Sequence, residues 1–248
     1  NTILAIANGI KIFQPKFKTA GLKETAKIAY PYCSYNTWRI GSRIFPIRKS
    51  MIKENCKRPV DSSILYLHDS IYYDGYWQSE EYFKDIKGII LKEFSFPPFD
   101  ERNEACAKEI ISSNSLSIHI RRGDFLNHPL YKDICTLQYY QDAIKRICAL
   151  AKIDHAFIFS NDIQWCEDNL SLFLNDQMTT YIDWNKGSQS YNDIHLMSLC
   201  KHNIIANSSF SWWGAWLNPN PDKVVISPRI WDNSGAVSNP ICKDWIKI

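Results

Sequence analysis

The strongest constraint on the fold of this 248-residue chain is a regular alternation of short apolar segments and amphipathic segments after residue 100. We predict strands at 116–120, 155–159, 180–183, 203–206 and 223–226. We predict helices around and between them at 101–112, 137–151, 164–173, 191–199 and 210–217. Short strands that alternate with helices are typical of a parallel, doubly wound sheet. Ligands of such a sheet bind outside the carboxyl ends of its strands, so we expect the chemistry there.

The first 95 residues lack this pattern, because their prolines are irregularly placed and their hydrophobic periodicity is weak. We assign an apolar strand at 64–67 and a helix from Ser79 to Phe94. The next stretch, Phe-Ser-Phe-Pro-Pro-Phe-Asp at 94–100, contains paired prolines that break regular structure. We therefore predict two domains, residues 1–95 and 96–248, that meet at this linker.

Composition excludes several classes of protein. Hydrophobic residues make up 45% of the chain, which is enough for a sizeable core and excludes a disordered protein. No apolar run reaches the roughly 18 residues that a membrane-spanning helix needs. The formal net charge of +3 is too small to indicate a nucleic-acid partner.

The eight cysteines form no C-x-x-C pair and no Cys/His cluster with zinc-site spacing. Several lie in apolar periodic segments, where a small buried thiol is the simplest interpretation. Scattered cysteines without an export signal fit a reducing cytosol. We predict no metal site and no disulfide framework.

The first strand of the alternating region ends in His119-Ile-Arg-Arg-Gly-Asp124, with four ionisable groups in six positions. Burying Arg121 and Arg122 without partners would be very unfavourable, and Asp124 can neutralise only one of them. The planar donor fork of arginine suits a phosphate or diphosphate, so we predict an anion site here. The alternative is that Asp124 pairs with one arginine and locks the loop. Strand alternation places on one face Leu116, Ile118 and Ile120, and on the other Ser117, His119 and Arg121.

Two further strand ends carry polar side chains. The second strand is followed by Asn161 and Asp162, which could accept from a base edge or a ribose and are equally good helix N-caps. After the fourth strand, Asn207, Ser208 and Ser209 lead directly into a helix, whose N-terminus attracts phosphate without a glycine loop. We predict that Asn207 caps this helix while both serines donate to a diphosphate; the alternative is capping alone. Helical spacing predicts core positions for Trp212, Trp213 and Trp216.

Several common motifs are absent from the sequence. It contains no G-x-G-x-x-G, no G-x-x-x-x-G-K-[ST] and no G-x-S-x-G. No two aspartates lie two positions apart, so the D-x-D pattern that holds a divalent ion on a nucleotide is missing. Arginine and a helix N-terminus would then neutralise the diphosphate. These features together indicate a metal-free enzyme or binding protein for a nucleotide diphosphate.

Taken together, the segments 119–124, 159–162 and 207–216 resemble the motifs of α-1,2-fucosyltransferases, which form glycosyltransferase family 11. Segments 75–78 and 190–200 are similar to that family as well. The resemblance implies a GT-B-like α/β fold with two Rossmann-like halves, the C-terminal one a doubly wound parallel sheet that binds the nucleotide. It implies GDP-fucose as donor, inversion at the fucose anomeric carbon, no metal cofactor, and transfer to the 2-hydroxyl of a terminal galactose on a glycan.

The resemblance also assigns roles to residues. Arg121 would hold the β-phosphate and assist its departure, supported by Arg122 and Asp124 as the rest of the catalytic set. A preorganised guanidinium stabilises the charge that accumulates on the leaving diphosphate. The donor-binding set would comprise His119, Asn161, Asp162, Asn207, Ser208, Ser209 and Phe210.

The chain departs from the family pattern at its start. The glycine-rich Gly-Gly-Leu-Gly-Asn-Gln stretch that usually follows the first strand is absent, and the chain opens on Asn1 rather than Met. We expect this chain to bind GDP but to transfer fucose slowly or not at all unless it is extended upstream by a strand and a glycine-rich loop. The general base is unassigned, with candidates in the acceptor half at His68, Asp69, Asp74 and Glu80.

Two alternatives stand beside the fucosyltransferase interpretation. One is a non-catalytic GDP-sugar-binding or glycan-binding relative of such an enzyme, and the other is an arginine-based transferase for a different GDP-sugar. For the location we expect the cytoplasm, with peripheral attachment to the inner face of the membrane as a variant of that expectation.

Overall fold

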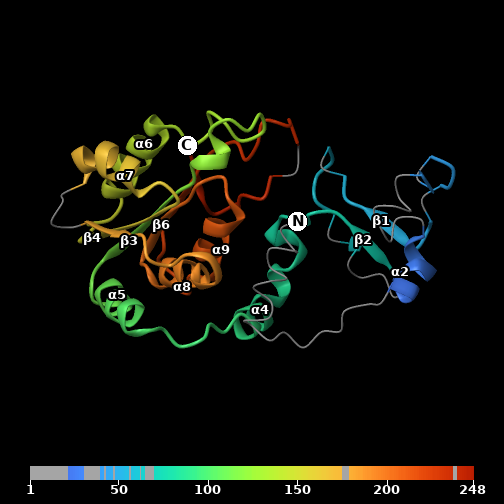
Figure 1. Cartoon of the computed structure of the whole chain (residues 1–248), viewed down its shortest axis with the longest axis horizontal. Helices are drawn as coiled ribbons and strands as arrows, with labels where there is room; N and C mark the ends of the chain where they lie inside the picture. Colours follow the sequence, from blue (N-terminus) through green and yellow to red (C-terminus); the bar gives the residue numbers. More distant parts are fainter. Residues whose placement is uncertain are drawn as a thin grey trace. The chain divides into compact units, whose positions relative to one another are not determined.

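The computed structural model describes residues 22–30, 40–41, 43–46, 48–55, 57–61, 63–64, 70–174, 179–236 and 239–248. The chain divides into two compact units (Figure 1). The first unit comprises Asn1–Phe94 with Ala236–Ser238, and the second comprises Ser95–Gly235 with Asn239–Ile248. Of the strand predicted at 64–67, all but Ile64 lies outside the described residues, as do His68 and Asp69.

In the first unit, two short strands pair in parallel, β1 (Met51–Lys53) with β2 (Tyr72–Asp74). Sequence periodicity did not predict them, because three residues are too few to show an alternation. Helix α2 (Leu22–Ala29) precedes them, and helix α4 (Lys87–Glu93) ends the unit. The continuous helix that we predict from Ser79 is wrong in part.

The predicted helix is interrupted near its start. Ser79 does act as an N-cap, because its hydroxyl oxygen accepts from the Glu81 N–H. The helical backbone that it starts is a single 3₁₀ turn, Glu80–Tyr82, which ends where Phe83 adopts a φ of −147°. A second 3₁₀ turn at Lys84–Ile86 leads into α4.

The second unit is built on a six-stranded, entirely parallel sheet with the order β5-β4-β3-β6-β7-β8. From β3 the chain extends the sheet in one direction through β5 and then, from β6, in the other. The switch point lies between β3 and β6, so the predicted doubly wound parallel sheet is confirmed. Strand bounds are β3 (Ser115–Ile120), β4 (His155–Ser160), β5 (Thr179–Ile182), β6 (His202–Ile204), β7 (Val225–Ser227) and β8 (Ile246–Lys247).

Helices cover both faces of this sheet. In Figure 1, α6 and α7 lie on one side of the strands, while α5 and α8 lie on the other. Helix starts follow local capping, since Asp100, Thr136 and Asp162 each accept from a backbone N–H of the first turn. Helix bounds are α5 (Glu101–Ser112), α6 (Leu137–Cys148), α7 (Ile163–Leu170), α8 (Tyr191–Leu199) and α9 (Ser209–Leu217).

The two faces of β3 carry the side chains that strand alternation predicts. Leu116, Ile118 and Ile120 are fully buried against residues of α6 and α7. On the opposite face, the Ser117 hydroxyl accepts from the Asn203 amide at 2.6 Å. The predicted core positions in α9 hold for Trp212 and Trp216, which are buried, while Trp213 is half-buried.

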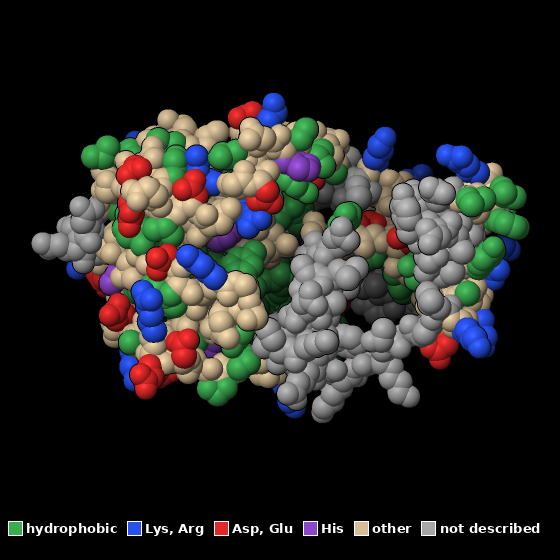
Figure 2. Space-filling view, in the orientation of Figure 1, with side chains coloured by type: hydrophobic (Ala, Val, Ile, Leu, Met, Phe, Trp, Pro, Cys, Tyr) green, Lys and Arg blue, Asp and Glu red, His purple; other side chains and the backbone are tan. Residues whose placement is uncertain are grey.

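Surface charge is mixed on the face of the second unit drawn in Figure 2, where Lys and Arg side chains are interspersed with Asp and Glu. That face presents no basic stripe of the kind that nucleic-acid-binding proteins use. In the described part of the chain, no helix combines the length and the apolar character needed to cross a bilayer.

We predict that Ile118→Ala lowers the free energy of unfolding by about 2–5 kcal/mol, because it leaves a cavity in the central strand. Leu172→Ala serves as the control, since Leu172 is 85% exposed and its loss is expected to cost less than about 0.5 kcal/mol. Urea unfolding of both variants measures the difference. Equal losses would show that β3 is not the centre of the core.

Candidate functional site

A pocket of about 620 Å³ opens in the second unit at the carboxyl ends of β3, β4 and β5. This is the edge of the sheet where the fold predicts a ligand. Two loops and the first turns of α7, α8 and α9 complete its wall. The lining side chains that bear on its chemistry are His119, Arg121, Asn161, Asn185, Asp193 and Phe210.

His119 is the last polar side chain of β3 and is almost completely buried. Its Nδ1 atom has no hydrogen-bond partner among the described residues. Burial, helped by the neighbouring charge of Arg121, lowers the pKa of His119 to about 3, so the imidazole is neutral near pH 7. The ring lies 5.5 Å from that of Phe210, measured between centroids. The structure therefore leaves this imidazole with hydrogen-bonding capacity at the pocket wall.

Arg121 extends from the end of β3 into the pocket lining. Its Nη2 atom lies 2.8 Å from Oδ1 and 3.0 Å from Oδ2 of Asp124. The guanidinium carbon also lies 5.3 Å from the centre of the Phe125 ring. Asp124 is 61% exposed and Arg121 is 36% exposed, so water screens the pair and a bound anion can compete for the guanidinium.

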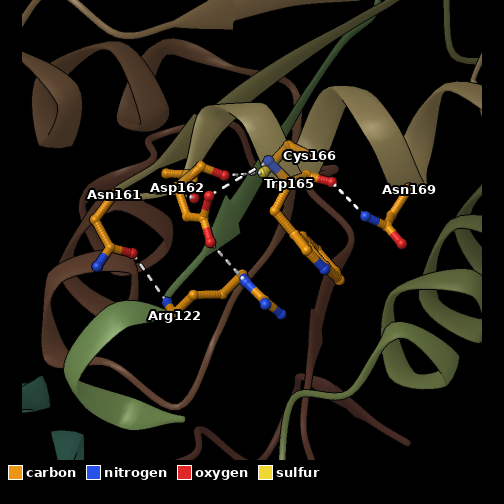
Figure 3. Close-up of polar contacts among 7 residues, drawn as sticks. Arg122, Asn161, Asp162, Trp165, Cys166 and Asn169 are labelled. Atoms are coloured by element: carbon orange, nitrogen blue, oxygen red, sulfur yellow. Dashed lines mark hydrogen bonds and ion pairs between the residues drawn. The ribbon is translucent and has the colours of Figure 1, made fainter.

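Arg122 points toward Asp162 and Trp165 at the start of α7 (Figure 3). Its Nε donates to Oδ2 of Asp162 at 3.0 Å, and its guanidinium carbon lies 4.0 Å from the centre of the Trp165 ring. Its backbone N–H donates to the Asn161 side chain at 2.9 Å. The premise that Asp124 is the one carboxylate available to the two arginines is therefore wrong, because Asp162 supplies a second. Arg122 anchors the loop to α7 and does not line the pocket.

Asp162 caps a helix, as the alternative interpretation predicts. Its Oδ1 accepts from the Trp165 N–H at the start of α7, and its Oδ2 accepts from Arg122. Asp162 is not among the residues that line the pocket, and its contact with a nucleoside stays a prediction. Asn161 does line the pocket, with its carbonyl oxygen turned to the Arg122 backbone.

At the start of α9, the cap is Ser208 and not the predicted Asn207. The Ser208 hydroxyl oxygen accepts from the Phe210 N–H, and its proton remains available to a ligand. Asn207 is buried instead, donating to the Trp231 carbonyl and accepting from the Cys135 thiol. Ser209 is the first residue of the helix, and within this group Phe210 lines the pocket.

Sequence reasoning missed Asp193, which lines the pocket from the first turn of α8. Burial raises the pKa of its carboxyl to about 7, although a hydrogen bond from the Asn185 amide opposes the shift. An acidic residue in the first turn is an ordinary partner of the helix dipole, so the sequence offered little to distinguish it. It is the one acidic residue of α8, and that was the available signal.

The remaining site predictions concern the base and the metal. Asp74 ends β2 and Glu80 opens a 3₁₀ turn, so both belong to the first unit, and no role is assigned to either. Among the residues that the structure describes, no group of three or more His, Cys, Asp or Glu side chains is placed to hold a metal ion.

Comparison with known proteins identifies the family. The sequence model of glycosyltransferase family 11 matches residues 53–248, most of the chain. The chain belongs to glycosyltransferase family 11. The matched range includes the arginine motif that follows β3 and the start of α9.

Relatives within the curated proteins are glycosyltransferases. An O-antigen biosynthesis glycosyltransferase, WbnK, of Escherichia coli is 37% identical over 140 residues, 55% of this chain and 45% of WbnK. An alpha-1,2-colitosyltransferase of Escherichia coli is 32% identical over 185 residues, 72% of this chain and 63% of that protein. Human galactoside alpha-(1,2)-fucosyltransferase 1 is 24% identical over 184 residues, 62% of this chain and 48% of the relative. The chain thus spans about half to two thirds of these family members.

Among solved structures, the NodZ alpha-1,6-fucosyltransferase soaked with GDP-fucose overlaps with a TM-score of 0.44 and 17% identity. The overlap covers 64% of this chain and 56% of NodZ. A similarity this low assigns neither fold nor function. The family assignment depends on the sequence match, and the fold on the sheet described above.

Gly123 holds the arginine loop against Asn161, and we predict that Gly123→Ala destabilises the protein. Its φ of +52° disfavours any side chain, and an added Cβ would lie 2.7 Å from Nδ2 of Asn161. Gly235→Ala is the matched control, since Gly235 has a φ of +72° with open space around it. The free energy of unfolding is expected to fall by about 1–2 kcal/mol for the control and by more for Gly123→Ala. Equal losses would mean that contact with Asn161 does not matter.

Proposed function

We propose that this protein transfers fucose from GDP-fucose to the 2-hydroxyl of a terminal galactoside, with inversion and without a metal ion. One observation carries the proposal: in a member of glycosyltransferase family 11, Arg121, His119 and Asp193 line one pocket at the carboxyl edge of the sheet. These side chains match the two chemically distinct ends of a guanine nucleotide diphosphate.

Arg121 matches the diphosphate end. Its planar fork can donate to two phosphate oxygens at once, and its present partner Asp124 is exposed enough to be displaced. As the bond to the sugar breaks, negative charge accumulates on the β-phosphate, and a guanidinium already in place stabilises it. The N-terminus of α9 and the Ser208 hydroxyl add further donors at the neighbouring strand end.

Asp193 and His119 match the base end. Guanine presents two N–H donors and one carbonyl acceptor on a single edge. An ionised carboxyl accepts both donors, and a neutral imidazole can donate to the carbonyl without adding charge beside Arg121. Adenine and uracil do not offer two adjacent N–H donors on one edge, so this pair of side chains favours a guanine nucleotide.

A second donor is favoured by one relative. The alpha-1,2-colitosyltransferase is 32% identical to this chain, and colitose is fucose without its 3-hydroxyl. Both sugars would present the same diphosphate and base to the pocket. The residues named above therefore select the nucleotide, and a direct comparison of GDP-fucose with GDP-colitose decides the sugar.

The deciding experiment incubates the protein with labelled GDP-fucose and lactose, with and without EDTA, and follows GDP binding by calorimetry. We expect transfer to the galactose 2-hydroxyl that survives EDTA. Tight GDP binding without turnover would favour the non-catalytic alternative, and transfer that is lost with EDTA would contradict the metal-free mechanism. Faster transfer from GDP-colitose would assign the other donor.

Arg121→Lys is expected to lower kcat about 100- to 1,000-fold although the charge is kept, because an ammonium cannot donate to two phosphate oxygens in the same fixed geometry. Arg146→Lys on the exposed side of α6 is the matched control and is expected to leave kcat unchanged. Steady-state kinetics on the GDP-sugar measures both. A kcat near that of the parent for Arg121→Lys would remove this residue from the mechanism.

A further inference from the structure

Two buried amide side chains form a closed pair beneath the pocket. Asn103 of α5 donates to the Asn185 side chain, and Asn185 donates back to Asn103, each at 2.9 Å. Asn103 is completely buried and Asn185 is 8% exposed. Asn185 lines the pocket, whereas Asn103 lies behind it. Neither residue is among the site residues predicted from the sequence.

Each amide uses its second N–H on a carboxylate. The Asn103 amide donates to Asp100 at 3.0 Å, and the Asn185 amide donates to Asp193 at 2.8 Å. The Asn103 carbonyl oxygen also accepts from the Trp184 indole at 2.9 Å. These partners fix the orientation of the pair, because a reversed Asn103 amide would set its oxygen against the Asp100 carboxylate and its NH₂ against the indole. The fixed orientation of the pair therefore directs the second N–H of Asn185 at the Asp193 carboxyl.

Helix α8 also packs against residues 96–99, which open the second unit. The His195 ring stacks against Phe96 at 4.3 Å and against Phe99 at 4.0 Å between ring centroids. His195 lies two residues after Asp193, and Asp100 follows Phe99 directly. Residues 96–103 thus contact α8 directly at His195 and reach the Asp193 carboxyl through the Asn103–Asn185 pair.

We propose that Asn185, braced by Asn103, is a positioning residue that holds the Asp193 carboxyl in the one orientation that receives the base edge of the nucleotide. The inference rests on the proposed function and deepens it, since it explains how a buried carboxyl stays directed at the ligand. Without the Asn185 N–H, the carboxyl loses the donor that sets its rotation and that favours its charged form.

The surroundings of Asp193 fix the expected dependence on pH. Burial raises the pKa of the carboxyl to about 7, and only the ionised form accepts two N–H donors. GDP affinity of the parent should therefore fall as pH drops through about 7. Loss of the Asn185 donor raises this pKa further, so the midpoint moves to higher pH. The other titratable or charged groups around it are Lys186, Asp183, Arg121 and His119 in the pocket wall, Cys106 on α5 and His195 on α8.

The test compares GDP with inosine diphosphate, which lacks the 2-amino donor of guanine, and with ADP. Their affinities are measured by calorimetry between about pH 6 and pH 9, on both sides of the carboxyl's titration. Asn185→Ala is expected to weaken GDP roughly ten- to hundredfold, to weaken inosine diphosphate and ADP less, and to raise the pH midpoint. Asn103→Ala is expected to do the same to a smaller extent.

Asn220→Ala is the matched control, because its amide also donates a hydrogen bond, here to the backbone carbonyl of Lys201 at the amino end of β6, away from the pocket. It should leave the nucleotide preference and the pH midpoint unchanged. Asn185→Ser, which keeps a donor, provides a second variant should Asn185→Ala fail to fold, and it is expected to retain part of the preference for GDP.

The outcomes separate the two proposals. A parent protein that binds GDP and ADP equally would contradict the guanine-nucleotide function. A parent that prefers GDP, with Asn185 variants that keep the same preference and the same pH midpoint, would overturn the positioning role and leave the function standing. A uniform loss for all three nucleotides without a midpoint shift would likewise reduce Asn185 to a structural residue.

Discussion

The burial of β3 on both faces is the constraint on which the rest of the site depends. Every residue of this strand is buried, so each polar side chain on it needs an internal partner. Ser115 accepts from the Lys201 N–H, and Ser117 accepts from Asn203. The unsatisfied Nδ1 of His119 occurs only at the carboxyl end, where the pocket begins. Ser115 and Ser117 thus have hydrogen-bond partners within the protein. At the pocket edge, His119 keeps a nitrogen atom to which a ligand can bond.

Burial also decides which groups in the pocket carry charge. It keeps His119 neutral and brings the pKa of Asp193 close to 7. Arg121 is only half-buried, and its guanidinium stays within reach of water and of an anion. The basic side chains in this wall are therefore Arg121 and Lys186, whereas His119 offers a neutral hydrogen-bonding group. Such a division suits a ligand that is anionic at one end and polar but uncharged at the other.

Local signals in the sequence predicted most of the second unit. Helices α5 and α8 have the predicted bounds, and α5 begins at its Asp100 cap. The features that the sequence did not predict depend on very short segments or on residues far apart in the chain. The three-residue strands β1 and β2 show no periodicity, and the position of the α9 cap depends on which backbone turns first, Asn207 or Ser208. Partners far apart in sequence, such as Asn103 and Asn185, become visible only in the fold.

The two neighbouring arginines have different roles, and strand alternation is enough to predict the difference. Successive side chains of a strand point to opposite faces, so neighbouring arginines at its end cannot both enter one pocket. Arg121 continues the face of Ser117 and His119, and Arg122 continues the face that packs on α7. There it needs its own carboxylate and an aromatic surface, which Asp162 and Trp165 supply. The motif therefore combines one arginine that is available to an anion with one that fixes the loop. The same alternation that predicted the core face of β3, carried two residues further, separates the two roles.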